Sequence, residues 1–385
     1  MASVGLSGPP SSGASRTRSR SRGRIRRSGR SDESEPHESH GRSRRSRGSD
    51  YSESLDPRTV RLFSWSQLQH CTNGFAEAAQ VGPQGGFGIV YRGTVEEREV
   101  AIKVMRGALT ADSSKQFVAE VRTLSRVHHA NLIRLIGYCQ EAGRCVLVYP
   151  FYPGGNLCDR LFNLPVRGAG AGGSAACLPP LGLAERISIG YQMAQGLRYL
   201  HFGAHPPVLH RDIKGTNVLL DGGAGTELRA VLADFGLARI SEQVFDTQQD
   251  VLIQPSCLVG TEGYIAPEYR AGELSPKADV YSFGVLLLEM MTGRTAREPA
   301  LPSTGTKWQT LPEWVKSIHE CRNLNIVGTV VDRSLRCDLT RCKNGEQMVL
   351  EMLLLALQCV EADAQLRPNI DVVEERIGHI MNLQR

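Results

Sequence analysis

The run VLHRDIKGTNVLL, residues 208–220, constrains this chain more than any other feature of its sequence. It places Asp212, Lys214 and Asn217 at short, fixed intervals between two apolar stretches. Seventeen residues beyond Asn217 the run ADFGLAR adds Asp234 before a Phe-Gly pair. Chance is a poor explanation of this spacing. Acid-rich turns beside apolar strands explain either run alone, but not both in this order.

The side chains of these two runs fit the transfer of a phosphoryl group to an alcohol. Asp212 can accept the proton of the attacking hydroxyl, and Lys214 can neutralise the transferring group. Asn217 and Asp234 offer two hard oxygen ligands, which suit the coordination of Mg²⁺ to phosphates. The spacing therefore predicts a loop that carries phosphoryl-transfer chemistry.

A second pair of charges lies upstream. The stretch EEREVAIKVM alternates as a strand does and contains Lys103, although a lysine that ends an apolar strand is usually only a surface residue. The stretch SKQFVAEVRTLSRV has the apolar spacing of a helix and places Glu120 on its buried side. A buried carboxylate needs a cation, so Lys103 is predicted to pair with Glu120.

The stretch QVGPQGGFGIVYRG, residues 80–93, is typical of a loop that covers the phosphates of a nucleotide. Pro83 stands where such loops usually begin with glycine, and it removes one backbone donor. The donors at the tip, residues 85–88, are retained. Alternatively, Gly82 serves as the first glycine and the hairpin is one residue longer, which loops tolerate.

Together these motifs resemble the eukaryotic protein kinases over roughly residues 75–382. Within that superfamily the chain is similar to the branch of plant receptor-like cytoplasmic kinases, Pelle and the interleukin-receptor-associated kinases. The resemblance rests also on FSWSQLQHCTNGF at 63–75, VGTEGYIAPEY at 259–269 and KADVYSFGVLLLEMMTGR at 277–294. It implies an α+β, bilobal fold, with a small N-lobe that is mostly β and a larger C-lobe that is mostly α.

The implied organisation is a disordered tail over residues 1–60 and a kinase domain over 61–385. Within that domain the resemblance places the N-lobe at about 75–149, the hinge at 150–154 and the C-lobe at 155–383.

The resemblance also implies the site residues and their cofactors, ATP and Mg²⁺. The catalytic residues would be Asp212, Lys214, Lys103 and Glu120, and the metal ligands Asn217 and Asp234. Tyr149 would be the gatekeeper, Pro150 would offer its carbonyl to adenine and Tyr152 its N–H. The full set implied to hold ATP is Gly82, Gly85, Gly86, Phe87, Gly88, Val90, Ala101, Lys103, Tyr149, Pro150, Tyr152, Asn217, Leu219 and Asp234.

Three sets of structural contacts follow from the same resemblance. They are the apolar stack of Leu124, His210 and Phe235, the anchoring of the catalytic loop by Asp279, and the ion pair of Glu268 with Arg367.

Substrate class and regulation are predicted from the later motifs. Lys214 lies two residues after Asp212, and Thr261 lies near the acceptor, a pattern of kinases that act on Ser or Thr. The activation loop would lie between Asp234 and Glu268. Arg211 would receive a phosphate from this loop, and Ser256 and Thr247 are the favoured sites among Ser241, Thr247, Ser256 and Thr261.

The net charge of +5 comes from the tail, since residues 1–50 hold 12 Arg against 5 acidic residues and the rest holds 33 basic against 35 acidic. Residues 11–54 are rich in Arg and Ser and poor in apolar residues, so we expect them to be disordered. They could contact RNA or an acidic surface weakly, or form only a solvated tail. The folded part gives no charge argument for nucleic-acid binding.

Ten scattered cysteines without a C-x-x-C pair indicate reduced thiols. The longest apolar stretch, residues 348–360, is too short to span a bilayer and contains Glu351, so we expect a buried helix and no transmembrane segment. These features predict a cytoplasmic kinase, with the nucleus as an alternative location, that acts on protein substrates and is recruited by an adaptor or receptor. The alternatives are a pseudokinase scaffold and an adaptor that works through its Arg/Ser tail.

Overall fold

The computed structural model describes residues 60–81, 88–105, 111–141, 143–167, 175–221, 228–240, 259–299, 308–321 and 325–383. The chain divides into Met1–Ser54, which lies outside these residues, and Leu55–Arg385, to which every element below belongs.

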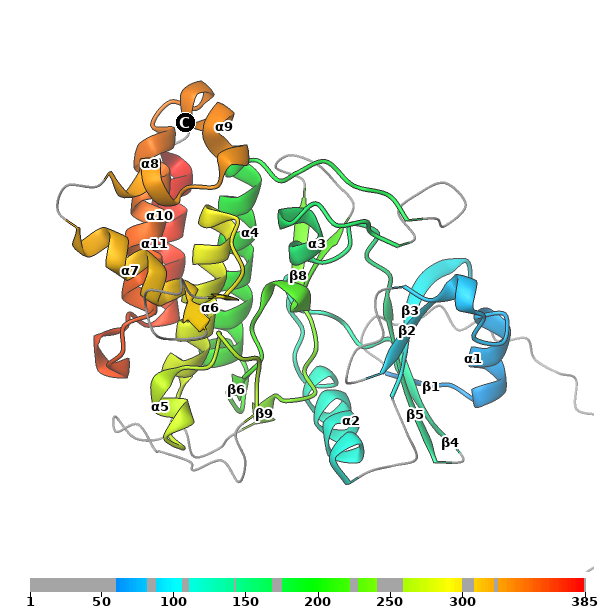
Figure 1. Ribbon diagram of the computed structural model, residues 1–385. Coiled ribbons are helices and arrows are strands. Elements are labelled where there is room, and N and C mark those ends of the chain that lie inside the picture. The colour runs from blue at the N-terminus through cyan, green and yellow to red at the C-terminus, as the bar shows by residue number, and fades with distance from the viewer. Residues whose placement is uncertain are drawn as a thin grey trace, which may run out of the picture. The chain divides into compact units, whose positions relative to one another are not determined.

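The first elements form a five-stranded sheet with two helices (Figure 1). The strand order is β1-β4-β5-β3-β2; β1 runs parallel to β4, and the other neighbours are antiparallel. The elements are β1 (Arg61–Leu62), α1 (Trp65–Cys71), β2 (Ile89–Val95), β3 (Arg98–Val104), α2 (Ala111–Leu124), β4 (Gly137–Glu141) and β5 (Arg144–Pro150). The strand predicted around Lys103, the helix predicted around Glu120 and the lead-in helix at 63–75 are therefore confirmed as β3, α2 and α1.

Helix α1 covers one face of this sheet. Ser64 begins the helix, because its side chain accepts a hydrogen bond from the backbone N–H of Gln67, and the Gln67 side-chain oxygen accepts one from the backbone N–H of Ser64. Leu68 then packs, fully buried, in a cluster with Phe63 and with residues of β3, β4 and β5. Alternate residues of β3 point to the opposite face, where Ala101 and Lys103 are left for the site described below.

The rest of the described chain is mostly helical (Figure 1). Its helices are α3 (Leu157–Leu161), α4 (Leu183–Arg198), α5 (Pro267–Arg270), α6 (Pro276–Thr292), α7 (Leu311–Glu320), α8 (Ile326–Val330), α9 (Arg336–Arg341), α10 (Gly345–Cys359) and α11 (Ile370–Asn382). The short strands are β6 (Val208–Leu209), β7 (Val218–Asp221), β8 (Arg229–Leu232), β9 (Arg239–Ile240), β10 (Arg297–Pro299) and β11 (Trp308–Thr310). An α+β fold with a sheet-rich and a helix-rich lobe is what the sequence predicted.

Helix α6 is the central support of the helical lobe. Ser275 accepts a hydrogen bond at its start, Pro276 occupies the first turn, and the helix stops at Gly293 in the left-handed region. Nearly every side chain between them is buried. Helix α10 packs against α6, and its residues Leu353 and Ala356 have no exposed surface, so the buried helix predicted at 348–360 is confirmed.

Two antiparallel strand pairs hold the loops that carry the motifs. In the first pair, β6 comes directly before His210 and pairs with β9, which follows Asp234 in the chain. In the second pair, β7 pairs with β8, which ends two residues before Asp234. Because β6 leads into the loop and β7 leads out of it, Asp212 to Asn217 are held at both ends.

The Gly-rich stretch at 164–180 lies between α3 and α4, as expected of an insertion. Its middle, residues 168–174, lies outside the described residues. At its ends, however, Val166 forms a β-bridge with Ala176 and is buried against Gly155, where an added Cβ would lie 2.8 Å from a Val166 methyl. The base of the insertion is therefore packed rather than free, because a valine beside a glycine fills the space that a side chain would take.

Candidate active site

One face of the five-stranded sheet carries four of the residues predicted to hold ATP. Val90 of β2 lies opposite Lys103 of β3, and Ala101 lies opposite Tyr149 of β5. Residues opposite each other in an antiparallel pair point to the same side, as do residues two apart in one strand. Val90, Ala101, Lys103 and Tyr149 therefore share one face of the sheet.

Lys103 joins two carboxylates that are far apart in the sequence. Its Nζ lies 2.9 Å from Asp234 Oδ1 and 3.3 Å from Glu120 Oε2, so the predicted pair of Lys103 with Glu120 is present. Burial alone would disfavour the charged amine, but the carboxylates of Asp234 and Glu120 outweigh it and raise the pKa of Lys103 above its ordinary value. In turn, Lys103 holds the pKa of Asp234 below its usual range in spite of burial.

Tyr149 adds a contact that the sequence did not predict. Its hydroxyl donates a hydrogen bond of 2.5 Å to Glu120 Oε1, while Lys103 binds the other oxygen. Glu120 is 1% exposed and has a donor at each oxygen. The tyrosine thus ties β5 to α2, besides standing at the predicted gatekeeper position.

The predicted hinge follows β5 directly. Pro150 is the last residue of β5, and Tyr152 is half-buried two residues later. The chain then pairs with β7: Gly154 N donates to Leu220 O, and Leu220 N donates to Gly155 O, both at 2.9 Å. These bonds fix β7, and hence Leu219, beside the hinge segment.

Asp212 lies at the centre of a compact set of hydrogen bonds. Its Oδ1 accepts a hydrogen bond from the Thr261 hydroxyl at 2.7 Å, and its Oδ2 accepts one from Lys214 Nζ at 2.7 Å. Lys214 also donates to the Thr261 oxygen at 2.7 Å. The three residues form a closed triangle, although Thr261 lies 49 positions after Asp212 in the chain. Asp212 is 4% exposed.

Asn217 and Asp234 have the donor set that Mg²⁺ needs. Asn217 uses its Nδ2 in both hydrogen bonds to Asp212, at 2.8 Å to the carbonyl and 3.1 Å to Oδ2, so these bonds leave its side-chain oxygen unused. Asp234 receives Lys103 on Oδ1, and Oδ2 takes no part in that bond. In the described residues, no group of three or more His, Cys, Asp or Glu side chains is arranged to hold a metal ion by itself. Mg²⁺ beside a nucleotide needs only one or two protein oxygens, so the residues present fit it.

Buried contacts fix the loop that contains Asp212. Asp279 of α6 accepts hydrogen bonds from the backbone N–H groups of His210 and Arg211, each at 2.9 Å, as the sequence predicted. His201 Nε2 lies 3.0 Å from the same carboxylate. This hydrogen bond with His201 lowers the pKa of Asp279 even though burial opposes it.

Two members of the predicted stack of side chains, His210 and Phe235, are in contact beside the same loop. The ring of His210 meets the ring of Phe235 edge to face, with centroids 4.7 Å apart. Leu124, at the end of α2, belongs to the same buried cluster. Burial lowers the pKa of His210, which favours the neutral ring in this apolar setting.

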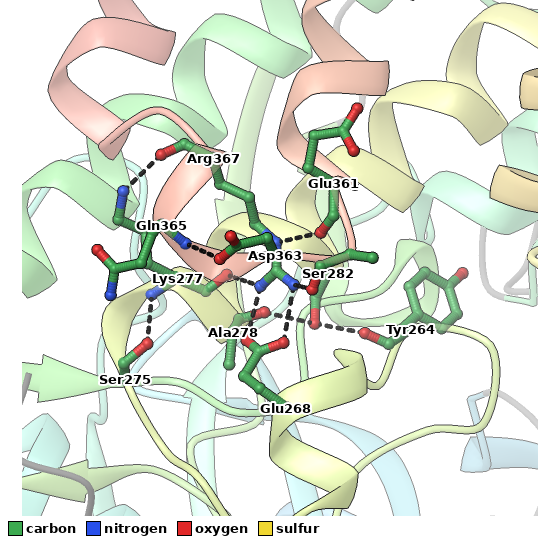
Figure 2. A network of polar contacts seen from close by, with 11 residues as sticks. Tyr264, Glu268, Ser275, Lys277, Ala278, Ser282, Glu361, Asp363, Gln365 and Arg367 are labelled. Carbon is green, nitrogen blue, oxygen red and sulfur yellow. Dashed lines mark hydrogen bonds and ion pairs between the residues drawn. The ribbon is translucent and has the colours of Figure 1, made fainter.

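The ion pair predicted between Glu268 and Arg367 is present, with the Arg367 side chain fully buried and the Glu268 side chain 11% exposed. Figure 2 shows the two side chains facing each other in a bidentate contact, with N–O distances of 2.6 and 2.7 Å. The remaining guanidinium donors reach the backbone oxygens of Lys277, Glu361 and Ala362. The contact therefore fastens α5, which follows the Thr261 segment, to the start of α6 and the loop before α11.

Arg211 has side-chain contacts that the sequence did not predict. Its side chain donates to the hydroxyl of Tyr269 and to the carbonyl of Leu237. The sequence predicted a phosphate from the activation loop as its partner, and that prediction concerns residues 241–258, which lie outside the described residues. The Tyr269 contact gave no signal in the sequence beyond its place after Ala-Pro-Glu.

Part of the predicted phosphate loop also lies outside the described residues: Gly82, Gly85, Gly86 and Phe87, together with Pro83. Gly88 is described and is buried, with φ at +147°. A Cβ on Gly88 would lie 2.3 Å from the carbonyl oxygen of Val104. Glycine is therefore required there by the close approach of β3, whatever the loop binds.

The family model described as protein tyrosine and serine/threonine kinase matches residues 77–377. The chain belongs to the protein kinase family. It is 38% identical over 80% of its length to a putative proline-rich receptor-like protein kinase of Arabidopsis thaliana. It is 36% identical over 84% of its length to a putative leucine-rich repeat receptor-like serine/threonine-protein kinase of the same plant.

These relatives are much longer than the matched region. The chain spans 39% of the length of the first relative and 32% of the second. The likeness to plant receptor-like kinases agrees with the branch that the sequence motifs indicated. Among the described residues, every helix is too short or too polar to cross a bilayer.

Proposed function

We infer that this chain transfers the γ-phosphoryl group of MgATP to Ser or Thr hydroxyls of protein substrates. The observation that carries this proposal is the closed triangle of Asp212, Lys214 and Thr261, next to Asn217. A base, a cation and a hydroxyl-bearing platform are the groups that an acceptor alcohol needs around it.

In the proposed reaction the Asp212 carboxylate receives the proton of the substrate hydroxyl. The hydroxyl oxygen forms a bond to the γ-phosphorus, the bond from that phosphorus to the β–γ bridging oxygen breaks, and ADP leaves with the electron pair. Lys214, 2.7 Å from Asp212, stabilises the negative charge on the group in transit. Both groups are fixed by hydrogen bonds before substrate arrives, which reduces reorganisation during the reaction.

Lys103 is assigned to the α- and β-phosphates, with Glu120 as its orienting partner. Asn217 and Asp234 would hold the metal, and Mg²⁺ would supply positive charge to the phosphate oxygens. Adenine would lie against Val90, Ala101 and Leu219, with the Pro150 carbonyl and the Tyr152 N–H as its hydrogen-bond partners. The phosphate-covering role remains with Gly82, Gly85, Gly86, Phe87 and Gly88.

The acceptor class follows from Lys214 and Thr261. Lys214 bridges Asp212 and Thr261, so the end of the predicted activation loop lies close to the proposed base. One of the relatives reported above is named a serine/threonine-protein kinase, which supports the same acceptor class here.

Regulation and context belong to the same proposal. Phosphorylation of Ser256 or Thr247 would regulate the kinase, and an adaptor or receptor would recruit it in intracellular signalling. The tail, residues 11–54, would add a weak contact to RNA or to an acidic surface. A truncated chain that lacks this tail should keep its kinase activity and change its location or RNA retention.

The proposal is tested by transfer of ³²P from labelled ATP to myelin basic protein, followed by phosphoamino-acid analysis. Wild-type protein should label Ser and Thr, and Asp212→Asn should lower the rate by about 10²–10⁴-fold, the usual contribution of a general base. Equal labelling by both proteins would refute the role of Asp212. A folded wild-type protein that transfers nothing would favour the pseudokinase scaffold.

A further inference from the structure

Arg211, the residue before Asp212, is held in a rare backbone conformation. Its φ is +70°, in the left-handed region that residues other than glycine seldom adopt. Such a conformation persists only where the surroundings hold it, and it often marks a functional constraint. The carbonyl of Arg211 is also closely approached, since a Cβ on Gly260 would lie 3.2 Å from it.

Two sets of contacts hold Arg211, one on its backbone and one on its side chain. The backbone N–H donates to Asp279 Oδ1 at 2.9 Å. The guanidinium donates twice to the hydroxyl oxygen of Tyr269, from Nε at 3.2 Å and from Nη2 at 2.5 Å. Its Nη1 donates to the carbonyl of Leu237, also at 3.2 Å.

Both side-chain partners of Arg211 are neutral. Within the part of the chain that the structure describes, no carboxylate lies in ion-pair range of this guanidinium. Tyr269 therefore supplies two of the three hydrogen bonds that orient the side chain. All three bonds come from a charged donor and are stronger than bonds between neutral groups; because two of them end on this hydroxyl, it is the main anchor of the side chain.

Tyr269 is itself held in place by its surroundings. Its side chain is 4% exposed, and it lies on α5 next to Glu268. Glu268 is locked by the bidentate contact with Arg367. A rigid chain of contacts thus runs from Arg367 through α5 to the Tyr269 hydroxyl and on to Arg211, one residue from the proposed base.

We propose that the Tyr269 hydroxyl is a positioning group for phosphoryl transfer: by binding the Arg211 guanidinium it holds Asp212 in its acceptor-facing position without a phosphate on the chain. The inference rests on the proposed function and deepens it, because it names a residue on which basal activity depends. Tyr269 contacts none of Lys103, Asp234 and Asn217, so its effect falls on turnover and not on the affinity for ATP.

A double-mutant cycle on the full chain tests this. Wild type, Tyr269→Phe, Arg211→Met and the double variant are treated with a protein phosphatase, and transfer of ³²P to myelin basic protein is measured. Tyr281→Phe is the matched control, since it removes a buried phenol hydroxyl from α6 while the ring beside Arg367 is kept.

Tyr269→Phe should lower kcat about tenfold with the KM for ATP within twofold, and Tyr281→Phe should leave kcat unchanged. The double variant should match Arg211→Met within threefold, because the hydroxyl acts only through Arg211. A purely structural role of Tyr269 would make the two losses multiply.

The inference is overturned if Tyr269→Phe lowers kcat less than threefold, or if the double variant falls more than threefold below Arg211→Met. Melting temperatures show whether each variant folds. Should Tyr269→Phe fail to fold, Arg211→Lys takes its place: it keeps the charge but loses the paired donors, so a tenfold loss supports the inference and a wild-type rate refutes it. A wild-type protein without transferase activity would refute the proposed function as well, whereas an active wild type with an unaffected Tyr269→Phe refutes this inference alone.

Discussion

Two buried ion pairs in this molecule, around Arg367 and around Lys103, are built in opposite ways. The Arg367 side chain is 0% exposed, and all five of its N–H donors are used, two on Glu268 and three on backbone oxygens. Lys103 is 13% exposed and is shared between Glu120 and Asp234, of which Asp234 is 23% exposed.

The difference distinguishes a purely structural contact, the Glu268–Arg367 pair, which we call the anchor, from the Lys103 site, where polar groups are left to bind a ligand. Around Arg367 every polar group is satisfied, so nothing is left for a ligand and removal of either partner strands a buried charge. The two acidic partners of Lys103 differ from Glu268. Glu120 also accepts a hydrogen bond from Tyr149, and Asp234 has a second oxygen that Lys103 does not bind. Saturation of the hydrogen bonds, more than burial, distinguishes the two regions.

The largest effect on stability is expected at the anchor. Arg367→Met should lower the free energy of unfolding by about 3–5 kcal/mol, because Glu268 would keep its charge without a partner. Denaturant titration measures the loss. Arg376→Met is the matched control, since Arg376 contacts the exposed Gln358 side chain, and it should change stability by less than about 1 kcal/mol. Equal effects of the two variants would contradict the role of the anchor.

Glu289 provides an intermediate case, a buried carboxylate that has no ion-pair partner among the described residues. It accepts a hydrogen bond from the Tyr264 hydroxyl at 2.5 Å and one from the Ala296 N–H at 2.9 Å. Burial raises its pKa to about 7 from an ordinary value of 4.5. The folded protein then binds this proton more tightly than the unfolded chain, so stability is highest at low pH and is lost as the pH rises through 7.

Between pH 4.5 and 7, wild type should therefore lose about 3 kcal/mol relative to Glu289→Gln, which has no charge to bury. Denaturant titrations of both proteins at pH 5 and pH 8 measure this difference. A gap between the two proteins that does not change with pH would show that hydrogen bonds alone stabilise the ionised carboxylate.

At Lys103, in contrast to Arg367, we expect a large effect on activity and a small effect on stability. Lys103→Met should lower kcat at least about 100-fold, because the charge that orients the phosphates is lost. It should lower the free energy of unfolding by only about 1–2 kcal/mol, less than Arg367→Met, since Asp234 is partly exposed and the buried Glu120 carboxylate keeps its hydrogen bond from Tyr149. Activity and denaturant titration on the same preparation check the ratio. A large loss of stability with little loss of activity would reverse the comparison.

The smallest effect is expected at Tyr149. Tyr149→Phe removes one hydrogen bond to Glu120 and leaves Lys103 in place, so the free energy of unfolding should fall by about 1 kcal/mol and kcat only a few-fold. Thermal melting and transfer assays measure both. If this variant were as inactive as Lys103→Met, the gatekeeper hydroxyl would have to act on the reaction directly.

Much of this arrangement could be predicted because the motifs are many and ordered. The pairs of Lys103 with Glu120 and of Glu268 with Arg367 follow from the family resemblance, and in the first case also from the need of a buried carboxylate for a cation. The strand and helix patterns around Lys103 and Glu120 indicated β3 and α2 correctly.

Other contacts could not be predicted from local patterns. Tyr269 contacts Arg211 from 58 positions along the chain, and the left-handed backbone at Arg211 has no signal in an arginine side chain. Strand β1 has two residues, too few for a period, and it exists because it pairs with β4. Val166 lies in the Gly-rich stretch 164–180, whose composition gives no sign of a buried residue. Its packing against Gly155 is a tertiary contact, which a local pattern does not predict.

The central claim, that Lys103, Asn217 and Asp234 converge on one magnesium nucleotide, is tested most directly by calorimetric titration of ATP with and without Mg²⁺. Wild type should bind ATP at least about tenfold more tightly with Mg²⁺, and Asp234→Asn should remove that gain, because it takes away a charged metal ligand. ATP affinity that is the same with and without Mg²⁺ in wild type, or a gain that Asp234→Asn retains in full, would contradict the account.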